Sequence, residues 1–167
     1  EFLEGLEKYT AASSYPEVFG AKVYKIARDG SRLTYLKVTG GCLRVKMPLT
    51  NRKEGQEHSE QRWEEKVDQI RIYSGAKYET VPEACAGMVC AVTGLNHTYP
   101  GQGLGAEVDS GPPMLQSVLN YQIILPPDCE PYQTLGKLRE LEEEDPQLHL
   151  VWNDKLGEIH AKVQGRV

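Results

Sequence analysis

The residues best suited to bind a charged ligand in this sequence are basic, and they lie close together. Between Gly20 and Lys53, nine lysines and arginines stand against a single carboxylate, that of Asp29. The whole chain of 167 residues has a net charge of -5, so the rest of it carries ten basic and 23 acidic residues. Two interpretations fit the basic run. It forms a face that holds RNA phosphates in a fixed orientation, or it is a solvated strand face with alternating lysines.

A glycine-rich run, Gly101-Gln102-Gly103-Leu104-Gly105, has the composition of a phosphate-binding loop. A dinucleotide-binding loop lies between a strand and a helix, and a P-loop ends in Gly-Lys-Ser or Gly-Lys-Thr. Here Ala106-Glu107-Val108-Asp109 follows, which supplies no lysine and two carboxylates that repel an anion. Because three prolines also occur between residues 100 and 113, we interpret this range as an interdomain linker.

The other reactive side chains are scattered and predict no catalytic, cofactor or metal site. The four cysteines lack zinc-ligand spacing, so we interpret them as plain thiols in a reducing cytoplasm. The four histidines show no ligand spacing and are expected at solvent-facing positions. The acidic run over residues 140–145 predicts a solvated helix face. Trp63 either stacks on a base or pins its loop against the core, and we prefer the second interpretation.

Short strands separated by turn residues predict the first structural unit. Val18 to Ile26 and Leu33 to Val38 flank the turn Arg28-Asp29-Gly30-Ser31 and predict a hairpin. Further strands are expected at 67–73 and 88–92, and the polar range 50–65 is expected to be an exposed loop. Strands at a spacing of about 8 to 12 residues favour a closed β-barrel over a parallel sheet.

The C-terminal part of the chain predicts an α+β unit. A strand at 117–125 precedes a helix at 130–144, whose Leu135, Leu138 and Leu141 share one face and which Asp145-Pro146 ends. Alternating apolar residues around Leu150 and Ile159 then predict a hairpin, with His160 opposite Val151 and His149 opposite Lys162.

The ends of the chain indicate a piece of a longer protein. There is no initiator methionine and no leader peptide, and residues 1–12 have the spacing of an amphipathic helix that needs a neighbour to cover it. Because no apolar run approaches the roughly 18 residues of a membrane helix, we expect no membrane partner and a cytoplasmic location.

Several segments resemble the elongation factor G superfamily of translational GTPases. The strands at 19–26 and 32–37 resemble the opening hairpin of the family's second domain, and Glu143-Glu144-Asp145-Pro146 after a leucine-rich helix resembles its third. The family usually has a glycine shortly after the Gly41-Cys42-Leu43 turn, where this chain has Arg44-Val45-Lys46. Within that superfamily, three segments most resemble the tetracycline ribosomal-protection proteins: Pro113-Met114-Leu115-Gln116, Asp145-Pro146-Gln147-Leu148 and Gly157-Glu158-Ile159.

The resemblance implies a mainly β chain with an α+β part: a translation-factor-type β-barrel followed by an incomplete ferredoxin-like βαββ unit. Residues 1–16 would end the GTPase domain and lead to the barrel at 17–99, the linker at 100–113 and the partial third domain at 114–167. The parent's GTP and Mg²⁺ would lie in the GTPase domain, so this fragment is expected not to be an enzyme.

The partners implied by the resemblance are the small ribosomal subunit, through its rRNA and protein, and the parent's own GTPase domain. Because other domains mainly set the parent's task, tetracycline protection, translocation and factor release all stay open. A stand-alone protein-interaction barrel without a ribosomal role is the alternative, and an independent enzyme is the least favoured. Under the ribosomal hypothesis the rRNA phosphate contacts would come from Arg28, Arg32, Arg44, Lys46, Arg52 and Lys53.

Overall fold

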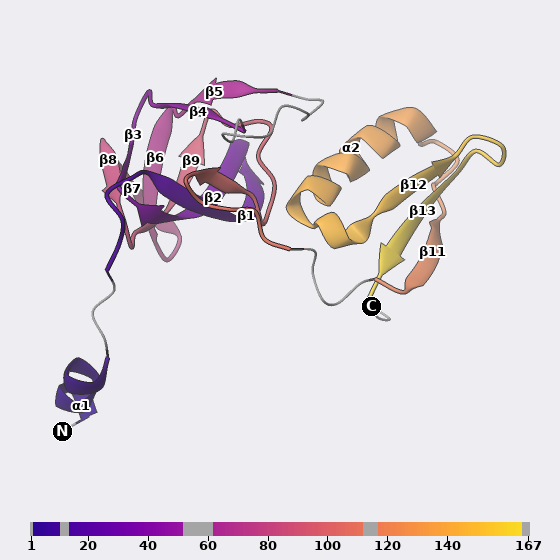
Figure 1. Ribbon diagram of the computed structural model, residues 1–167. Helices are drawn as coiled ribbons and strands as arrows, with labels where there is room; N and C mark the ends of the chain where they lie inside the picture. Colours follow the sequence, from indigo (N-terminus) through magenta and orange to yellow (C-terminus); the bar gives the residue numbers. More distant parts are fainter. Residues whose placement is uncertain (1, 11–13, 52–61, 112–116, 165–167) are drawn as a thin grey trace.

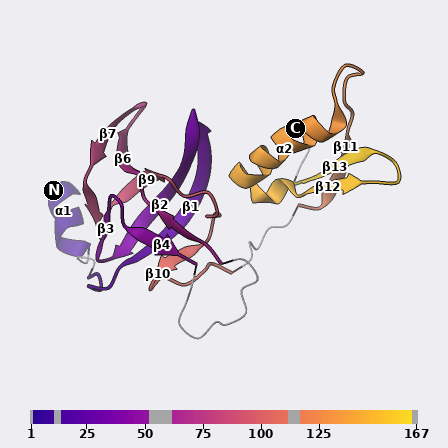
Figure 2. The same ribbon diagram turned by 90° about the horizontal axis from the view of Figure 1, so that it is seen from above.

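The computed structural model describes residues 2–10, 14–51, 62–111 and 117–164, which form an N-terminal helix and two larger units (Figures 1 and 2). The helix α1, Phe2–Tyr9, confirms the helical spacing of the first residues and buries none of its side chains. Figure 1 shows it standing apart from the rest of the chain. No helix within the described ranges is long and apolar enough to cross a membrane.

The first unit, residues 14–111, is built on a six-stranded antiparallel sheet. Its strand order is β10-β1-β2-β9-β6-β7. In chain order these strands are β1 Gly20–Asp29, β2 Ser31–Gly40, β6 Gln69–Ser74, β7 Lys77–Val81, β9 Val89–Thr93 and β10 Gly103–Gly105. The β1–β2 hairpin confirms the predicted turn, because Asp29 pairs with Ser31 and Gly30 adopts a φ of 66°, which glycine reaches at little cost.

Two short ribbons complete the first unit. Strand β3, Cys42–Arg44, pairs with β8, Glu83–Cys85, and β4, Pro48–Thr50, pairs with β5, Glu64–Lys66. They bring Leu43, Leu49 and Ala84 into one apolar core with the side chains from the inner face of the sheet. This cluster contains no charged residue, so the unit is stabilised chiefly by apolar burial.

The first unit has the predicted mainly β character, but its sheets do not close into a barrel. Strands β10 and β7 are the two ends of the sheet and do not pair with each other, and each ribbon is a separate two-stranded sheet. The expectation of a closed barrel is corrected in this respect. The spacing of turn residues along the sequence predicts how many strands there are. Closure of a barrel depends on which strands pair, and the spacing does not predict the pairing.

The predicted linker at 100–113 also requires correction. Strand β10 lies within that range and pairs with β1 through Gly20–Gly105, Ala21–Leu104 and Lys22–Gly103. Leu104 is 1% exposed and Gln102 3% exposed. The backbone NH of Gly101 donates to Val23 O at 2.8 Å. Residues 101–105 are therefore part of the first unit and do not link it to the next.

The second unit, residues 117–164, confirms the predicted βαββ order. Strand β11, Leu119–Ile123, precedes helix α2, Pro131–Glu144, the 3₁₀ turn η1, Pro146–Leu148, and strands β12, Leu150–Asn153, and β13, Glu158–Val163. The sheet order is β11-β13-β12. Glu130 caps α2 by accepting a hydrogen bond from the NH of Gln133.

The strand expected to include His149 begins later than predicted, at Leu150. Because η1 and a left-handed His149, with φ 35°, precede β12, the predicted pairing of His149 with Lys162 does not form, whereas Val151 pairs with His160 as predicted. Proline at 146 fixes its own φ and favours the turn. The alternation of apolar residues continued through this turn and suggested a strand that is too long.

Candidate nucleic-acid interface

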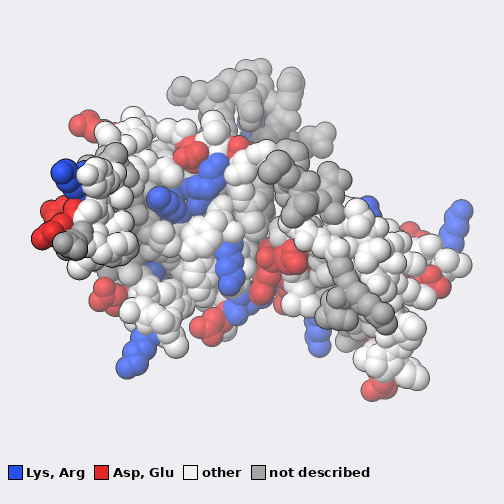
Figure 3. Space-filling model, turned by 90° about the horizontal axis from the view of Figure 1, so that it is seen from below, with Lys and Arg blue, Asp and Glu red and all other residues white. Residues whose placement is uncertain are grey.

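Arg28 and Arg32, two of the six predicted phosphate contacts, form ion pairs with helix α2. Arg28 Nη2 lies 3.0 Å and Arg32 Nε 3.1 Å from the same oxygen, Oε2 of Glu143. Glu140 adds an oxygen 3.8 Å from Arg28 Nε. Figure 3 shows acidic and basic side chains together where the two units adjoin. These two arginines therefore join the first unit to the second.

Arg32 is also tied into the first unit. Its guanidinium donates to Leu95 O at 2.7 Å, to Thr98 Oγ1 at 2.9 Å and to Thr98 O at 2.6 Å, and its side chain is 9% exposed. The Thr98 hydroxyl also lies 2.7 Å from that of Thr34, which is fully buried. A partly buried arginine with this many hydrogen-bond partners has a structural role.

We expect Arg32→Ala to destabilise the protein by about 2–3 kcal/mol, because it leaves buried oxygen acceptors without their donor. Arg28→Ala is the matched control. Its side chain is 36% exposed, and an exposed ion pair contributes at most about 1 kcal/mol. Urea unfolding followed by circular dichroism measures both losses, and equal losses would contradict the structural role of Arg32.

Arg44 and Lys46 lie on the surface of the first unit. Arg44 Nε is 2.9 Å from Glu83 Oε2, and Lys46 Nζ is 2.7 Å from Asp68 Oδ1. Their side chains are 72% and 68% exposed, so water screens both pairs. Lys46, Arg32 and Asp68 line one open surface pocket, whereas Arg28 and Arg44 do not line it. The structure therefore does not gather the predicted residues into one site.

The segment Arg44-Val45-Lys46, where the resemblance leads us to expect a glycine, contains a residue in the left-handed conformation. Lys46 has a φ of 66°, which is unfavourable for a side chain with a Cβ and which glycine adopts freely. Its NH donates to Val67 O at 2.7 Å, and this bond fixes the turn. This chain therefore forms a left-handed turn with lysine at position 46. Arg52 and Lys53, the last two predicted contacts, lie outside the described residues.

Trp63 contacts the protein core, as we preferred from the sequence. It packs against the core of the first unit, and its ring stacks on His97 with centroids 6.3 Å apart and an interplanar angle of 21°. Glu65 also binds His97, with Oε1 2.9 Å from Nδ1 of the ring. Its carboxylate accepts from the NH groups of Asn96 at 2.7 Å and His97 at 3.2 Å.

These hydrogen bonds make the contribution of Glu65 to the stability of the protein depend on pH. Burial alone raises the pKa of Glu65, but the bonds from Asn96 and His97 stabilise its charged form and bring the pKa below its usual value. A lowered pKa adds stability that is present above the unfolded pKa of about 4.3 and is lost as the pH falls through the folded pKa.

We therefore expect Glu65→Gln to lower the free energy of unfolding at pH 7 and to have progressively less effect below about pH 4. Urea unfolding between pH 7 and pH 3 measures this difference. Glu64→Gln, on the exposed side of β5, is the control and should give no such trend. A Glu65→Gln effect that is constant over the whole pH range would contradict the assignment.

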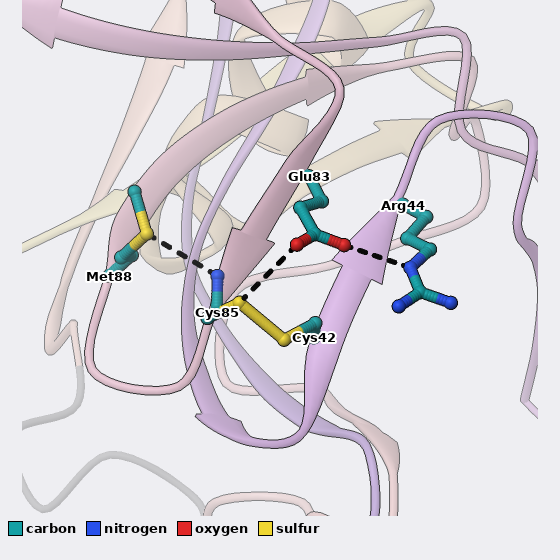
Figure 4. Close-up of a disulfide and its surroundings, with 5 residues drawn as sticks. All are labelled: Cys42, Arg44, Glu83, Cys85 and Met88. Atoms are coloured by element: carbon teal, nitrogen blue, oxygen red, sulfur yellow. Dashed lines mark hydrogen bonds and ion pairs between the residues drawn. A yellow bond between two sulfur atoms is a disulfide. The ribbon is translucent and has the colours of Figure 1, made fainter.

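The expectation that all four cysteines are free thiols is wrong for two of them. Cys42 and Cys85 form a disulfide across the β3–β8 ribbon, where they are directly paired and their Cα atoms are 4.0 Å apart (Figure 4). The sequence separation of 43 residues concealed this pair, because no local pattern links the two strands. Cys90 is a buried free thiol, as expected, and burial raises its pKa to about 12.

The two sulfurs of the disulfide also belong to a group of three potential metal-ligating side chains in the part of the chain that the structure describes. Cys42, Cys85 and Glu83 offer ligand atoms within 4.8 Å of one another. Glu83 is held by Arg44, and the NH of Cys85 donates to the sulfur of Met88 at 3.3 Å (Figure 4). Because cysteine binds metal as a thiolate, this cluster could hold an ion only after reduction.

Comparison with known proteins gives the family context of this arrangement. No protein-family model matches the chain. Elongation factor G 2 of Syntrophus aciditrophicus (strain SB) is 27% identical over 174 residues, which cover 94% of this chain and 24% of that protein. The chain is weakly homologous to elongation factor G. Elongation factor G of Amoebophilus asiaticus (strain 5a2) is 24% identical over 169 residues, which cover 96% of this chain and 23% of that protein.

The chain also shares its fold with a solved structure. A solved structure of a protein from Thermus thermophilus superposes with a TM-score of 0.66 at 21% identity and covers 96% of this chain and 24% of that one. The chain spans about a quarter of the length of its elongation factor G relatives. The homology to elongation factor G covers both the β unit and the α+β unit of the chain.

The carboxylates that neutralise the basic run were not apparent from its local sequence. Within Gly20–Lys53 only Asp29 is acidic, yet Glu143, Glu83 and Asp68 reach the run from segments 22 to 115 residues away. Figure 3 accordingly shows basic and acidic side chains interspersed on the face drawn. The excess of acidic residues in the rest of the chain was the one signal in the sequence for these ion pairs. In a folded chain, those carboxylates are expected to pair with the basic residues.

Proposed function

We propose that this chain is the ribosome-contacting, non-catalytic part of a GTP-dependent translation factor. The observation that carries the proposal is the homology to elongation factor G across 94% of the chain, which includes both units. The resemblance implies GTP and Mg²⁺ in a preceding domain of the parent, and a cytoplasmic protein whose partners are that domain and the small ribosomal subunit.

Among the predicted rRNA contacts, we assign Arg44 and Lys46 to phosphate binding, together with Arg52 and Lys53. The exposed pairs of Arg44 with Glu83 and Lys46 with Asp68 are weak in water, so a phosphate can replace the carboxylate at small cost. Arg28 and Arg32 instead hold α2 against the first unit. A ribosome that binds the first unit would thereby also orient the second.

The test is co-sedimentation of the whole 167-residue chain with small ribosomal subunits over a range of salt concentrations. We expect Arg44→Gln with Lys46→Gln to weaken binding and to reduce the slope of log affinity against log salt by about 0.7–0.9 per contact. Lys137→Gln with Arg139→Gln, on the exposed surface of α2, is a control with the same change in charge. Unchanged affinity and slope in the Arg44/Lys46 variant would remove these residues from the interface.

Ribosome binding that is absent for the unmodified chain would count against the function itself. It would favour the stand-alone protein-interaction module, in which the two units bind another protein. Binding that persists at the same strength in high salt would also count against a phosphate-based interface, because counterion release makes such binding strongly dependent on salt.

We further propose that the parent protein protects ribosomes from tetracycline, because three segments of the chain resemble the protection proteins most closely. The test uses the full-length parent with GTP and ribosomes that carry labelled tetracycline. We expect the parent to accelerate release of the label, and a parent that advances tRNA without releasing the drug would be a translocase instead.

A further inference from the structure

Four tyrosines form a row across the outer face of the six-stranded sheet. Tyr24 of β1 and Tyr35 of β2 have ring centroids 6.2 Å apart, and Tyr35 lies 5.7 Å from Tyr73 of β6. Tyr78 of β7 continues the row 5.3 Å from Tyr73. The row thus extends over most of the width of the sheet.

The intervening strand β9 allows these rings to meet. Its Ala91 pairs with Tyr35 on one side and with Arg71 on the other, so all three share a face of the sheet. Because alanine has no atom beyond Cβ, the tyrosines of β2 and β6 reach each other above it. Ala91 is 0% exposed, which shows that the larger neighbouring side chains cover it.

This face is not the one that forms the core. The side chains that alternate with the row, including Val23, Leu36 and Ile70, are fully buried on the opposite face. Tyr24 and Tyr78, at the two ends of the row, remain 49% and 46% exposed. The core cluster of the first unit contains none of these four rings, and the exposed surface of Tyr24 and Tyr78 is accessible to a ligand.

Basic side chains accompany the rings. Lys25 Nζ lies 5.7 Å from the centroid of Tyr35, and the Arg71 guanidinium lies 4.5 Å from that of Tyr78. Lys37, two residues beyond Tyr35 on β2, is exposed on the same face. No described carboxylate forms an ion pair with these three cations. Asp29, at the tip of the hairpin, faces the same side and contributes one negative charge.

We propose that this tyrosine face, made of Tyr24, Lys25, Tyr35, Lys37, Arg71, Tyr73 and Tyr78, binds single-stranded nucleic acid. Bases would stack on the accessible rings and the three cations would contact phosphates. Only unpaired bases have free faces to stack, so the face should discriminate against a duplex. The proposal goes beyond ribosome docking, because it concerns a ligand that needs no ribosome and a surface without Arg44 and Lys46.

The test measures fluorescence anisotropy of a labelled oligouridine of about 12 nucleotides with the whole chain, beside a blunt RNA duplex of the same length. We expect tighter binding of the single strand. The slope of log affinity against log salt should be about −2, which corresponds to three phosphate contacts of about 0.7 each. Tyr24→Leu and Tyr78→Leu should each lower the affinity about 5- to 100-fold, because each removes a stacking ring. Tyr24→Phe and Tyr78→Phe keep the ring and should retain the affinity.

Tyr132→Leu is the control, since Tyr132 is 66% exposed on α2 of the second unit, where its ring contacts Trp152. Circular dichroism of each variant establishes that it is folded. Equal binding of single strand and duplex would overturn the proposal, as would leucine variants that bind like the unmodified chain. Absence of oligonucleotide binding, with loss of binding to the parent's preceding domain in the leucine variants, would make the face a protein contact. Ribosome co-sedimentation is a separate assay, so either proposal can fail alone.

Discussion

Replacing Leu104 with alanine is expected to destabilise the first unit by about 2–4 kcal/mol. Leu104 is 1% exposed, belongs to the apolar core and lies on β10 opposite Ala21 of β1. Removal of its side chain loses apolar burial and leaves a cavity in a core that closes around it. Urea unfolding monitored by the fluorescence of Trp63, which packs on the same core, measures the loss.

The control for this prediction lies four residues further along the chain. Val108 is 68% exposed, so Val108→Ala should change the free energy of unfolding by less than about 0.5 kcal/mol. If residues 100–113 were a linker throughout, the two substitutions would be equally harmless. A loss below about 1 kcal/mol for Leu104→Ala would thus exclude β10 from the core.

The glycines of residues 101–105 explain why the sequence predicted a linker there. A Cβ on Gly103 would lie 2.4 Å from the carbonyl oxygen of Glu107, and one on Gly105 would lie 2.4 Å from that of Phe19. Gly105 also has a φ of 62°. The glycines therefore permit close backbone contacts inside a folded unit. Composition alone does not separate this use of glycine from its use in a linker.

Features encoded within a few residues were predicted well. The β1–β2 hairpin, helix α2 with its stop at Asp145-Pro146, and the Val151–His160 pairing each depend on periodicity and turn chemistry inside one short segment. Features that join distant segments were not predicted. The contact of Arg32 with Glu143 spans 111 residues, and only the folded chain brings the two side chains together.

The candidate site illustrates the same division. The count of basic residues between Gly20 and Lys53 was correct, but the count gave no information on their partners. Arg32, predicted as a phosphate contact, has a side chain that is 9% exposed and donates hydrogen bonds to Leu95 and Thr98. No local pattern predicted the tyrosine row. Its members come from four strands between positions 24 and 78, and no local spacing brings them together.

Reduction of the Cys42–Cys85 disulfide is expected to destabilise the chain by about 2–4 kcal/mol. The bond closes a loop with a sequence separation of 43 residues, which restricts the unfolded chain and so disfavours it. It also joins the β3–β8 ribbon, which has no other strand partner among the described residues. Urea unfolding of the unmodified protein with and without dithiothreitol measures the difference directly.

The double variant Cys42→Ser, Cys85→Ser should unfold at the urea concentration of the reduced protein and should not respond to dithiothreitol. Cys129→Ser, which removes an exposed free thiol, is the control and should retain the full response. Thiol titration of the denatured protein gives a second, independent measurement. It should find the two free thiols of Cys90 and Cys129 before reduction and all four afterwards. Four thiols before reduction, with unfolding that dithiothreitol does not alter, would mean that the two strands are held by hydrogen bonds and burial alone.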